Sequence, residues 1–395
     1  MNEMVKIKDF AEVITGGTPS TKVKEYWEKG TIPWLNSGEL NEDIVVKSDN
    51  YITNLGLEKS AARLMPKDTI LIALTGATTG VVGYLNIEAC ANQSVTGILP
   101  SKRHHPKYLY YYLKSIRNKV LSDSYGGAQK HISQGYIKGL EIPLFPLHIQ
   151  IRIADILDKA YGVSKKDQQL FLKYTELLQS IFYDMFGDPI KNEKKWEKIS
   201  LGELCNDFKY GTNQKSFDAP EKGAMPIIRI PNVLNNSVNY NDLKYSNLSG
   251  KEYNEVRLEK GDLLFVRTNG NPAYIGRCAV FNDTIEAGYA SYLIRARLKN
   301  KIIVLPEFLQ TTISFPSYRA LVLKRATTTA GNYNINTVAL KSLPIYLPPI
   351  ELQEEFLVIS QNIQQQKQRV SYQIRNSENL YQGLLQKAFN GELLN

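Results

Sequence analysis

The stretch ISQGYIKGLEIPLFPLHIQ (residues 132–150) aligns without a gap on INTVALKSLPIYLPPIELQ (residues 335–353), which lies 203 residues further along the chain. Seven of the nineteen positions are identical, and the identities run from Ile132 and Ile335 to Gln150 and Gln353. A match of this length at a shift of about half the chain predicts that the protein contains two copies of one structural unit.

Further matches lie upstream in the same order. DTILI at 68–72 corresponds to DLLFV at 262–266, PKYL at 106–109 to PEFL at 306–309, and IPWL at 32–35 to MPII at 225–228. The shift drifts from about 193 to 203 residues, as expected if loops differ in length between the copies. Four blocks in one order indicate a tandem duplication of the whole unit.

The first part of each copy, at 1–146 and 189–349, has short apolar runs separated by Gly, Asn, Thr and Pro. We call these parts head 1 and head 2. The apolar runs predict strands at 69–74, 81–85, 263–266 and 292–296. One helix per head is expected, near 106–121 and 306–324, because proline suits a first helical turn. Each head is therefore predicted to be a mixed α/β domain in an α+β fold.

The second part of each copy, at 147–188 and 350–395, predicts one long spacer helix. Apolar residues recur there at four- and three-residue spacing, which is typical of a coiled-coil seam. The seam residues are Ile153, Leu157, Ala160, Phe171, Tyr174, Leu178, Ile181 and Met185 in the first helix, and Leu352, Phe356, Ile359, Ile363, Val370, Leu380 and Leu384 in the second. We expect the two helices to form an antiparallel pair related by a pseudo-twofold repeat, each roughly 58 Å long.

Composition narrows the class of protein. The chain has 395 residues and a net charge of +9, and an excess of positive charge favours a polyanionic partner such as nucleic acid. Many soluble proteins are mildly basic, so the charge alone decides nothing. The cysteines Cys90, Cys205 and Cys278 stand apart, which predicts a reducing, cytoplasmic setting and no zinc site. No signal peptide or membrane span is expected.

Catalytic motifs are incomplete in the sequence. Asn271-Pro272-Ala273-Tyr274 approaches the tetrad that grips a flipped base in methyltransferases, but it lacks the second proline. Asp188 and Glu193-Lys194-Lys195 have the wrong order for a nuclease metal site, and no GxxxxGK[ST] loop exists to bind ATP. The four histidines have no metal-ligand spacing and are expected at the surface. We therefore expect no catalytic or metal site on this chain.

The order of these elements resembles the specificity subunits of type I restriction-modification enzymes, and the resemblance covers essentially the whole chain. It rests on the duplicated layout and on the proline hinge before each helix, FPLHIQIRIADIL (145–157) and LPPIELQEEFLVI (347–359). The DTILI and DLLFV strands, each followed by a glycine turn, and the C-terminal LLQKAFNGEL (384–393) complete it.

The resemblance implies different roles for the heads and for the long helices. Heads 1–146 and 189–349 would be target recognition domains, and helices 147–188 and 350–395 would set their spacing and dock two methyltransferase subunits. Double-stranded DNA and restriction subunits would be the further partners. S-adenosylmethionine and ATP would bind those other subunits, and this chain would carry no cofactor.

The loops after the matched strands differ between the heads, since LTGATT (74–79) stands against TNGNPA (268–273). Different side chains present different donors and acceptors to base edges, so the half-sites should differ and the target should not be palindromic. Heads at a fixed separation also require a fixed gap between half-sites, most simply about one turn of DNA.

Candidate DNA contacts are polar or aromatic residues at corresponding loops, since amides pair with adenine and arginine with guanine. In head 1 they are Thr18, Lys22, Asn36, Ser37, Thr75, Thr78, Thr79, Asn92, Gln93, Ser94, Gln129, Lys130 and His131. In head 2 they are Asn213, Lys215, Arg229, Arg267, Thr268, Asn269, Asn271, Tyr289, Ser291, Asn332, Tyr333 and Asn334. The competing interpretation is that each merely caps a turn. Arg267, which follows an apolar strand, and Lys130 are the stronger candidates.

Two other functions remain open from the sequence. The chain could be the recognition part of a fused methylase-nuclease, although it carries no complete catalytic motif. It could instead be a non-catalytic scaffold whose two heads hold protein or sugar ligands. Such a scaffold would be expected to show aromatic platforms or acidic pockets, whereas this chain is basic.

Overall fold

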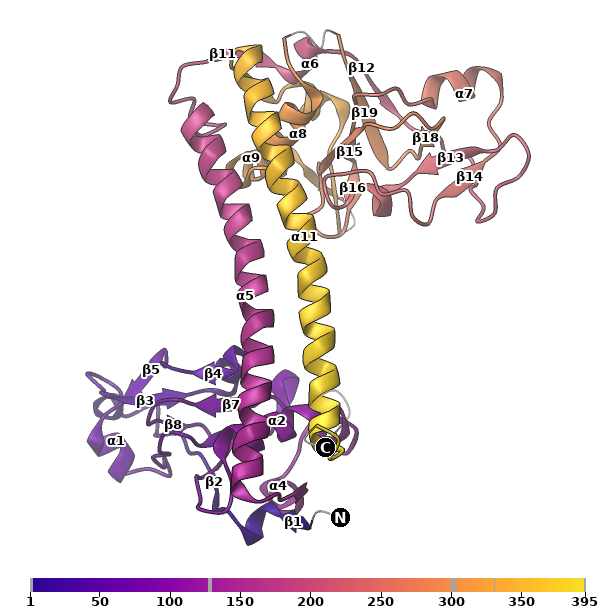
Figure 1. Ribbon diagram of the computed structural model, residues 1–395. Coiled ribbons are helices and arrows are strands. Elements are labelled where there is room, and N and C mark those ends of the chain that lie inside the picture. Colours follow the sequence, from indigo (N-terminus) through magenta and orange to yellow (C-terminus); the bar gives the residue numbers. More distant parts are fainter. Residues whose placement is uncertain (1–2, 127–129, 300–302, 330, 394–395) are drawn as a thin grey trace. The chain divides into compact units, whose positions relative to one another are not determined.

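The computed structural model describes residues 3–126, 130–299, 303–329 and 331–393. The chain divides into two compact units: unit 1 contains residues 1–169 and 370–395, and unit 2 contains residues 170–369. Each unit combines one head with part of α5 (Leu147–Phe186) and part of α11 (Ile350–Phe389), two helices of 40 residues each (Figure 1). The α+β fold with two repeated heads and two long helices is therefore confirmed.

The described residues of head 1 form three sheets and several short helices. Its strands are β1 (Met4–Lys6), β2 (Val13–Thr15), β3 (Ile32–Leu35), β4 (Ile44–Val45), β5 (Asn50–Ile52), β6 (Ile70–Ala73), β7 (Val82–Leu85), β8 (Cys90–Ala91), β9 (Val95–Ile98) and β10 (Glu141–Pro143). Its α-helices are α1 (Asn54–Glu58), α2 (Pro106–Ser115), α3 (Arg117–Ser122) and α4 (Gln134–Gly139). The sheet orders are β2-β9-β6-β7-β4, β5-β3-β8 and β1-β10.

Head 2 follows the same plan. Its strands are β11 (Glu197–Ser200), β12 (Cys205–Tyr210), β13 (Met225–Ile228), β14 (Lys244–Ser246), β15 (Asp262–Val266), β16 (Thr268–Asn269), β17 (Cys278–Phe281), β18 (Gly288–Tyr289), β19 (Leu293–Leu298), β20 (Thr327–Thr329), β21 (Asn332–Asn334) and β22 (Pro344–Leu347). Its α-helices are α6 (Leu201–Leu204), α7 (Gly250–Val256), α8 (Pro306–Ser314), α9 (Pro316–Arg325) and α10 (Thr337–Lys341).

The sheets of the two heads correspond strand by strand. The orders in head 2 are β12-β19-β15-β17, β14-β13-β18 and β11-β22, which repeat the first four strands, the second sheet and the third sheet of head 1. In both heads the middle strand of the three-stranded sheet pairs antiparallel with one neighbour and parallel with the other. A fourth sheet, β16-β21-β20, is formed in head 2. The shared topology supports the duplication inferred from the sequence.

The central strands form where the apolar runs predicted them. All four residues of β6 and all five of β15 are buried, because each strand lies inside its sheet with apolar neighbours on both faces. The prediction of a single helix in each head is wrong. The expected helix is divided into two consecutive helices, α2 with α3 and α8 with α9, and each head has further short helices. In head 2 the break follows from Pro316, which holds Phe315 in an extended conformation.

In unit 1 the N-terminal part of α5 packs antiparallel against the C-terminal part of α11 (Figure 1). Ile153 and Leu157 share a core with Tyr381 and Leu385, and Ser377 donates a hydrogen bond to Asp167 at 2.9 Å. The predicted seam is wrong at Leu380, which is 58% exposed. The polar residue Ser377 and the aromatic Tyr381 occupy the seam instead, so the apolar pattern alone gave the wrong phase.

In unit 2 the C-terminal part of α5 packs on α11 and on head 2 through phenylalanines. The ring of Phe182 lies 4.0 Å from that of Phe315 and 5.5 Å from that of Phe356, measured between centroids. Phe186, the last residue of α5, lies 4.9 Å from Phe308 in the same way. Neither Phe182 nor Phe186 was part of the predicted seam, although both are buried.

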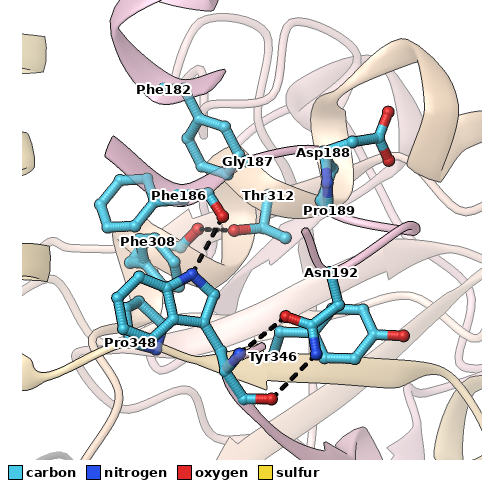
Figure 2. Close-up of a pocket in the computed structure, with 11 residues that line it drawn as sticks. Phe182, Phe186, Gly187, Asp188, Pro189, Asn192, Phe308, Thr312, Tyr346 and Pro348 are labelled. Carbon is cyan, nitrogen blue, oxygen red and sulfur yellow. Dashed lines mark hydrogen bonds between the residues drawn. The ribbon is translucent and has the colours of Figure 1, made fainter. Parts of the chain in front are cut away.

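Figure 2 shows the joint at which α5 ends, with Phe186 and Phe308 beside Pro348. Gly187 follows with a φ of 77°, a left-handed conformation that favours glycine and ends the helix. Trp196 Nε1 then donates to the carbonyl oxygen of Phe186 at 2.9 Å. The cavity at this joint has a volume of only about 10 Å³, room for at most one water molecule, so the joint is a packing contact.

The contact between head 1 and α5 is more polar than the contact between head 2 and α5. The carboxylate of Asp43 accepts hydrogen bonds from Lys114, at 2.9 Å, and from Tyr161 of α5, and it lies 3.3 Å from Lys165 Nζ. Burial alone would raise the pKa of Asp43, but these partners outweigh it and the net pKa lies below its ordinary value. A partly buried group of ion pairs and hydrogen bonds therefore joins the head to its own helix in unit 1.

Candidate nucleic-acid interface

Four loops of head 1 meet where strands β2, β3, β6 and β8 end. Backbone hydrogen bonds join them, from Gly17 N to Ala91 O (2.8 Å), Asn92 N to Leu35 O (2.9 Å), Leu74 N to Ser94 O (2.7 Å) and Ile132 N to Leu74 O (2.9 Å). We call this set of bonded loop ends the loop frame. Because backbone groups make the bonds, the side chains of the frame can change without breaking it.

Head 2 has the same loop frame. The corresponding bonds run from Thr212 N to Tyr289 O (2.9 Å), Ala290 N to Ile228 O (3.0 Å), Arg267 N to Tyr292 O (2.9 Å) and Ile335 N to Arg267 O (2.9 Å). A glycine precedes the first bond in both heads, and its close packing allows no side chain. A Cβ on Gly16 would lie 2.2 Å from Ala91 O, and one on Gly211 would lie 2.1 Å from Tyr289 O.

The loop frame corrects the alignment of one repeat block. Leu74 and Arg267 occupy equivalent positions, whereas the sequence match had set Leu74 against Thr268. The strand pairing agrees, since Ala73 faces Val95 and Val266 faces Leu293. Asp262 is then equivalent to Thr69, and not to Asp68. An apolar run such as TILI fits either alignment, and only the hydrogen bonds decide between them.

Most predicted residues of head 1 lie on or beside the loop frame. Thr18 donates a hydrogen bond to Gln93, which brings two of the predicted loops together. Asn36, Ser37, Thr75, Thr78, Asn92, Ser94 and His131 are partly exposed, whereas Lys22, Gln93 and Lys130 are exposed. His131 forms isolated antiparallel β-bridges with both Thr75 and Tyr125. Gln129 lies outside the described residues.

Several of these side chains also shape their own turns. Asn36 caps a short helix by accepting a hydrogen bond from Gly38 N at 2.8 Å, and Asn92 accepts one from Ser94 N at 3.1 Å. Thr79 is buried, and its hydroxyl donates to the carbonyl oxygens of Gly76 and Lys130. The structural role that competes with DNA contact is therefore real for these residues.

In head 2 a pocket of about 340 Å³ opens at the loop frame. Three predicted residues from three loops line it, namely Asn213, Arg229 and Ser291. The sequence did not single out Gln214, Ser216 and Tyr292, which also line the pocket. Each of the three directly follows or precedes a predicted residue, so a search of the neighbours of each candidate would have found them.

The two arginines of this site are held differently. Arg229 Nη2 donates to both the carbonyl oxygen and the carboxylate of Asp242, at 2.8 and 3.2 Å. Arg267 Nη1 donates to Ser291 O at 3.2 Å, and its guanidinium lies over the Tyr210 ring, 4.6 Å from the centroid. Among the described residues, Arg229 has an acidic partner and Arg267 has none.

The remaining candidates of head 2 fall into three groups. Thr268 and Asn269 form β16, which pairs with Asn334 and Tyr333 of β21, while Asn332 of β21 pairs with Thr329 of β20. Lys215 and Asn271 are exposed. Tyr289 is fully buried, and its hydroxyl donates to Lys209 O at 3.1 Å. Its burial places the ring inside the fold, so we do not include Tyr289, or the equally buried Thr79, in the proposed surface.

The described residues show no group of three or more His, Cys, Asp or Glu side chains placed to hold a metal ion. Within the same part of the chain, no helix combines the length and the apolar character needed to cross a membrane. The expectation that all four histidines lie at the surface is wrong for His104, which is 2% exposed. Its Nδ1 lies 2.8 Å from the hydroxyl of Ser101.

The duplicated heads and the two long helices are features that this chain shares with known proteins. The family described as "Type I restriction modification DNA specificity domain" matches residues 2–170 and 193–375, most of the chain. The chain belongs to this family, and it is a specificity subunit of type I restriction-modification systems.

Individual relatives agree with this assignment. The chain is similar to the type I restriction enzyme EcoKI specificity subunit of Escherichia coli (strain K12), at 27% identity over 93% of this chain and 84% of that protein. It is also similar to the MjaIX specificity subunit of Methanocaldococcus jannaschii, at 30% identity over 64% of each chain. A solved S subunit from M. genitalium shares the fold, with a TM-score of 0.59 at 18% identity over 98% of this chain and 96% of that one.

Proposed function

We propose that head 1 and head 2 each recognise one half of an asymmetric, interrupted DNA target. The observation that carries this proposal is the pair of matched loop frames with different side chains. Asn36 stands where head 2 has Arg229, Leu74 where it has Arg267, and Ser94 where it has Tyr292. The backbones of the two loop frames are alike, but their side chains offer different hydrogen-bond donors and acceptors. The two heads would therefore present related surfaces with different base preferences.

The proposed contact surface consists of the exposed and partly exposed candidates. In head 1 these are Thr18, Lys22, Asn36, Ser37, Thr75, Thr78, Asn92, Gln93, Ser94, Lys130 and His131. In head 2 they are Asn213, Lys215, Arg229, Arg267, Thr268, Asn269, Asn271, Ser291, Asn332, Tyr333 and Asn334. The lysines would contact phosphates, and the amides and arginines would contact base edges.

The long helices are the proposed docking surface for two methyltransferase subunits, and through them for restriction subunits. Large apolar side chains on these helices lie at the surface, including Leu172, Val358 and Tyr372. Exposed apolar residues on paired helices favour contact with another protein. Methyl transfer, DNA cleavage and the binding of S-adenosylmethionine and ATP are assigned in this proposal to those partners, and this chain supplies the recognition.

The proposed domain limits remain those of the sequence repeat. Residues 1–146 and 189–349 would be target recognition domains, and 147–188 and 350–395 would be the spacer helices. Exchange of residues 189–349 for the corresponding head of a relative tests both the limits and the function. The exchange should alter one half of the methylated motif and leave the other half unchanged.

Co-expression with a type I methyltransferase subunit, followed by mapping of modified bases, is the direct test. We expect a motif of two different halves separated by a constant gap. A symmetric or uninterrupted motif would contradict the proposal. A second measurement separates DNA recognition from a protein-binding scaffold, because contacts to phosphates weaken steeply with salt. Binding of DNA that is insensitive to salt would count against the basic surface as the site.

A further inference from the structure

Arg267 differs from the other cations of the loop frame in how it is held. It follows the fully buried strand β15, and both its backbone N–H and its carbonyl oxygen bond to the frame. Its side chain has two further contacts, with Ser291 O and with the face of Tyr210. The backbone and the guanidinium are therefore both fixed before any ligand arrives.

These contacts leave hydrogen-bond donors of Arg267 unused. A guanidinium carries five N–H donors in a planar fork, and the fold uses one of them for Ser291 O. The Tyr210 ring satisfies a face of the fork and none of its edge donors. No carboxylate among the described residues neutralises the group, in contrast to Arg229, which pairs with Asp242.

We propose that Arg267 recognises a guanine in the half-site of head 2, by donating two hydrogen bonds to O6 and N7. This inference rests on the proposed function and names the base that one side chain of that site contacts. A planar fork with two adjacent donors fits the two acceptors that guanine presents in the major groove. The contact with the Tyr210 ring and the bond to Ser291 O together restrict the fork, and a restricted fork favours a base edge over a mobile phosphate contact.

Head 1 lacks this recognition element at the equivalent position. Leu74 occupies it, and its side chain is 5% exposed and belongs to the core of head 1. An aliphatic side chain there offers no donor to a base. The guanine contact therefore belongs to the half-site of head 2, and it contributes to the asymmetry of the target.

Selection from a random double-stranded DNA library tests the inference, with the full chain in complex with its methyltransferase subunits. The wild-type complex should select an interrupted site with a guanine in the half-site that depends on head 2. Arg267→Gln should reduce the preference for that guanine by roughly 5- to 150-fold, and should leave the other positions unchanged. Glutamine pairs with adenine, so adenine should gain at the same position.

Lys215→Gln is the matched control, since it removes the same charge from an exposed residue of head 2. It should weaken binding uniformly across sequences and reduce the salt slope by about one. If Arg267→Gln behaves like this control, or changes nothing, the guanine contact is refuted while the bipartite site stands. If the wild-type complex selects no interrupted site at all, the proposed function fails and the inference fails with it. The melting temperature of each variant shows whether the fold is intact.

Discussion

Two buried glutamines explain why the strongest block of the repeat is preserved. Gln150 accepts a hydrogen bond from His105 N and donates to the carbonyl oxygens of Arg103 and Phe145, at 2.7, 3.1 and 2.7 Å. Gln353 makes the same three bonds to Leu305 N, Ile303 O and Pro348 O, at 3.0, 3.1 and 2.9 Å. In each copy one amide joins the start of the long helix to the loop before the head helix.

Replacing either glutamine by leucine should destabilise its unit. The change removes no volume but leaves one N–H and two carbonyl oxygens without partners, each a buried polar group. We expect a loss of about 1–3 kcal/mol in the free energy of unfolding for Gln150→Leu, measured by denaturant titration. Gln169→Leu, at an exposed position of α5, is the control and should stay within about 0.5 kcal/mol of wild type. Equal effects of the two changes would refute the bonding role.

His104 should make unit 1 sensitive to acid. Burial, with a smaller effect of His105, lowers the pKa of His104 from 6.5 to about 4. Between these values the unfolded chain binds the proton and the folded chain does not, so stability falls as the pH drops from about 6.5 to about 4. The loss from this group amounts to about 3 kcal/mol at most.

Two measurements check this expectation. The NMR titration of the His104 ring should have its midpoint near 4, and a midpoint near 6.5 would refute the burial effect. His104→Phe, which retains an aromatic ring beside Phe10, should lessen the decline of stability in the same pH range. If stability declines equally in the wild type and the variant, the acid sensitivity comes from other groups.

At the scale of elements, the spacing of apolar residues predicted those strands and helices in which one face of the element is apolar throughout. The strands at 69–74 and 263–266 and both long helices were predictable, since their apolar residues recur at the spacing of the element. Prediction failed where a polar residue lies in a buried seam, as Ser377 does, or where an apolar run permits two alignments, as at Leu74. Hydrogen-bond partners decide such cases, and they are distant in sequence.

The loop residues of the candidate site were predictable as a set because they follow buried strands in both heads. Their individual contacts were not. Nothing in the sequence distinguishes the buried Tyr289 from the exposed Tyr292, which lies three residues away at 58% exposure. The difference depends on strand β18, which pairs with β13 and places the side chain of Tyr289 in a buried core cluster.

The glycine that precedes each loop frame gives a prediction at the same scale. In Gly211→Ala the new Cβ would overlap Tyr289 O, so the frame of head 2 must shift. We expect a loss of about 1–3 kcal/mol in the stability of unit 2, measured by thermal or denaturant unfolding. Recognition of the head 2 half-site should weaken, while the head 1 half-site is unaffected.

Gly383→Ala is the control for this variant, because nothing lies within 4 Å of a Cβ at that position of α11. Alanine is the better helix former, so this change should be neutral or should stabilise by up to about 1 kcal/mol. If Gly211→Ala is equally well tolerated, the close approach of the two backbones is not a constraint on the frame.

At the scale of the whole molecule, the end of the chain completes the unit formed by its beginning. Tyr381, Leu385 and Ala388 of α11 belong to the core of head 1, and Phe389 packs 5.1 Å from Tyr112 between ring centroids. Unit 2, in contrast, is one continuous segment, residues 170–369. The two copies of the sequence repeat therefore do not coincide with the two folded units, because unit 1 takes its last segment from the second copy. The repeat alone could not reveal this.

Removal of residues 370–395 should consequently destabilise unit 1 and leave unit 2 folded. Tyr381 and Leu385 alone would cost unit 1 several kcal/mol, at about 2–5 kcal/mol for each large buried side chain. Differential scanning calorimetry should show one transition shifted to lower temperature and one unchanged. Hydrogen exchange in α2 and in α8 would identify which transition belongs to which unit. An unchanged transition for unit 1 would show that its core does not need α11.

The twin glutamines also bear on how such a gene can change. Each amide bonds only to main-chain atoms of its neighbours, so the contact is indifferent to which side chains flank it. A genetic crossover within residues 132–150 or 335–353 would join one head to a foreign helix with the anchoring amide still satisfied. Such a recombinant chain would still join its head to its helix by the same three hydrogen bonds, whichever head and helix are combined.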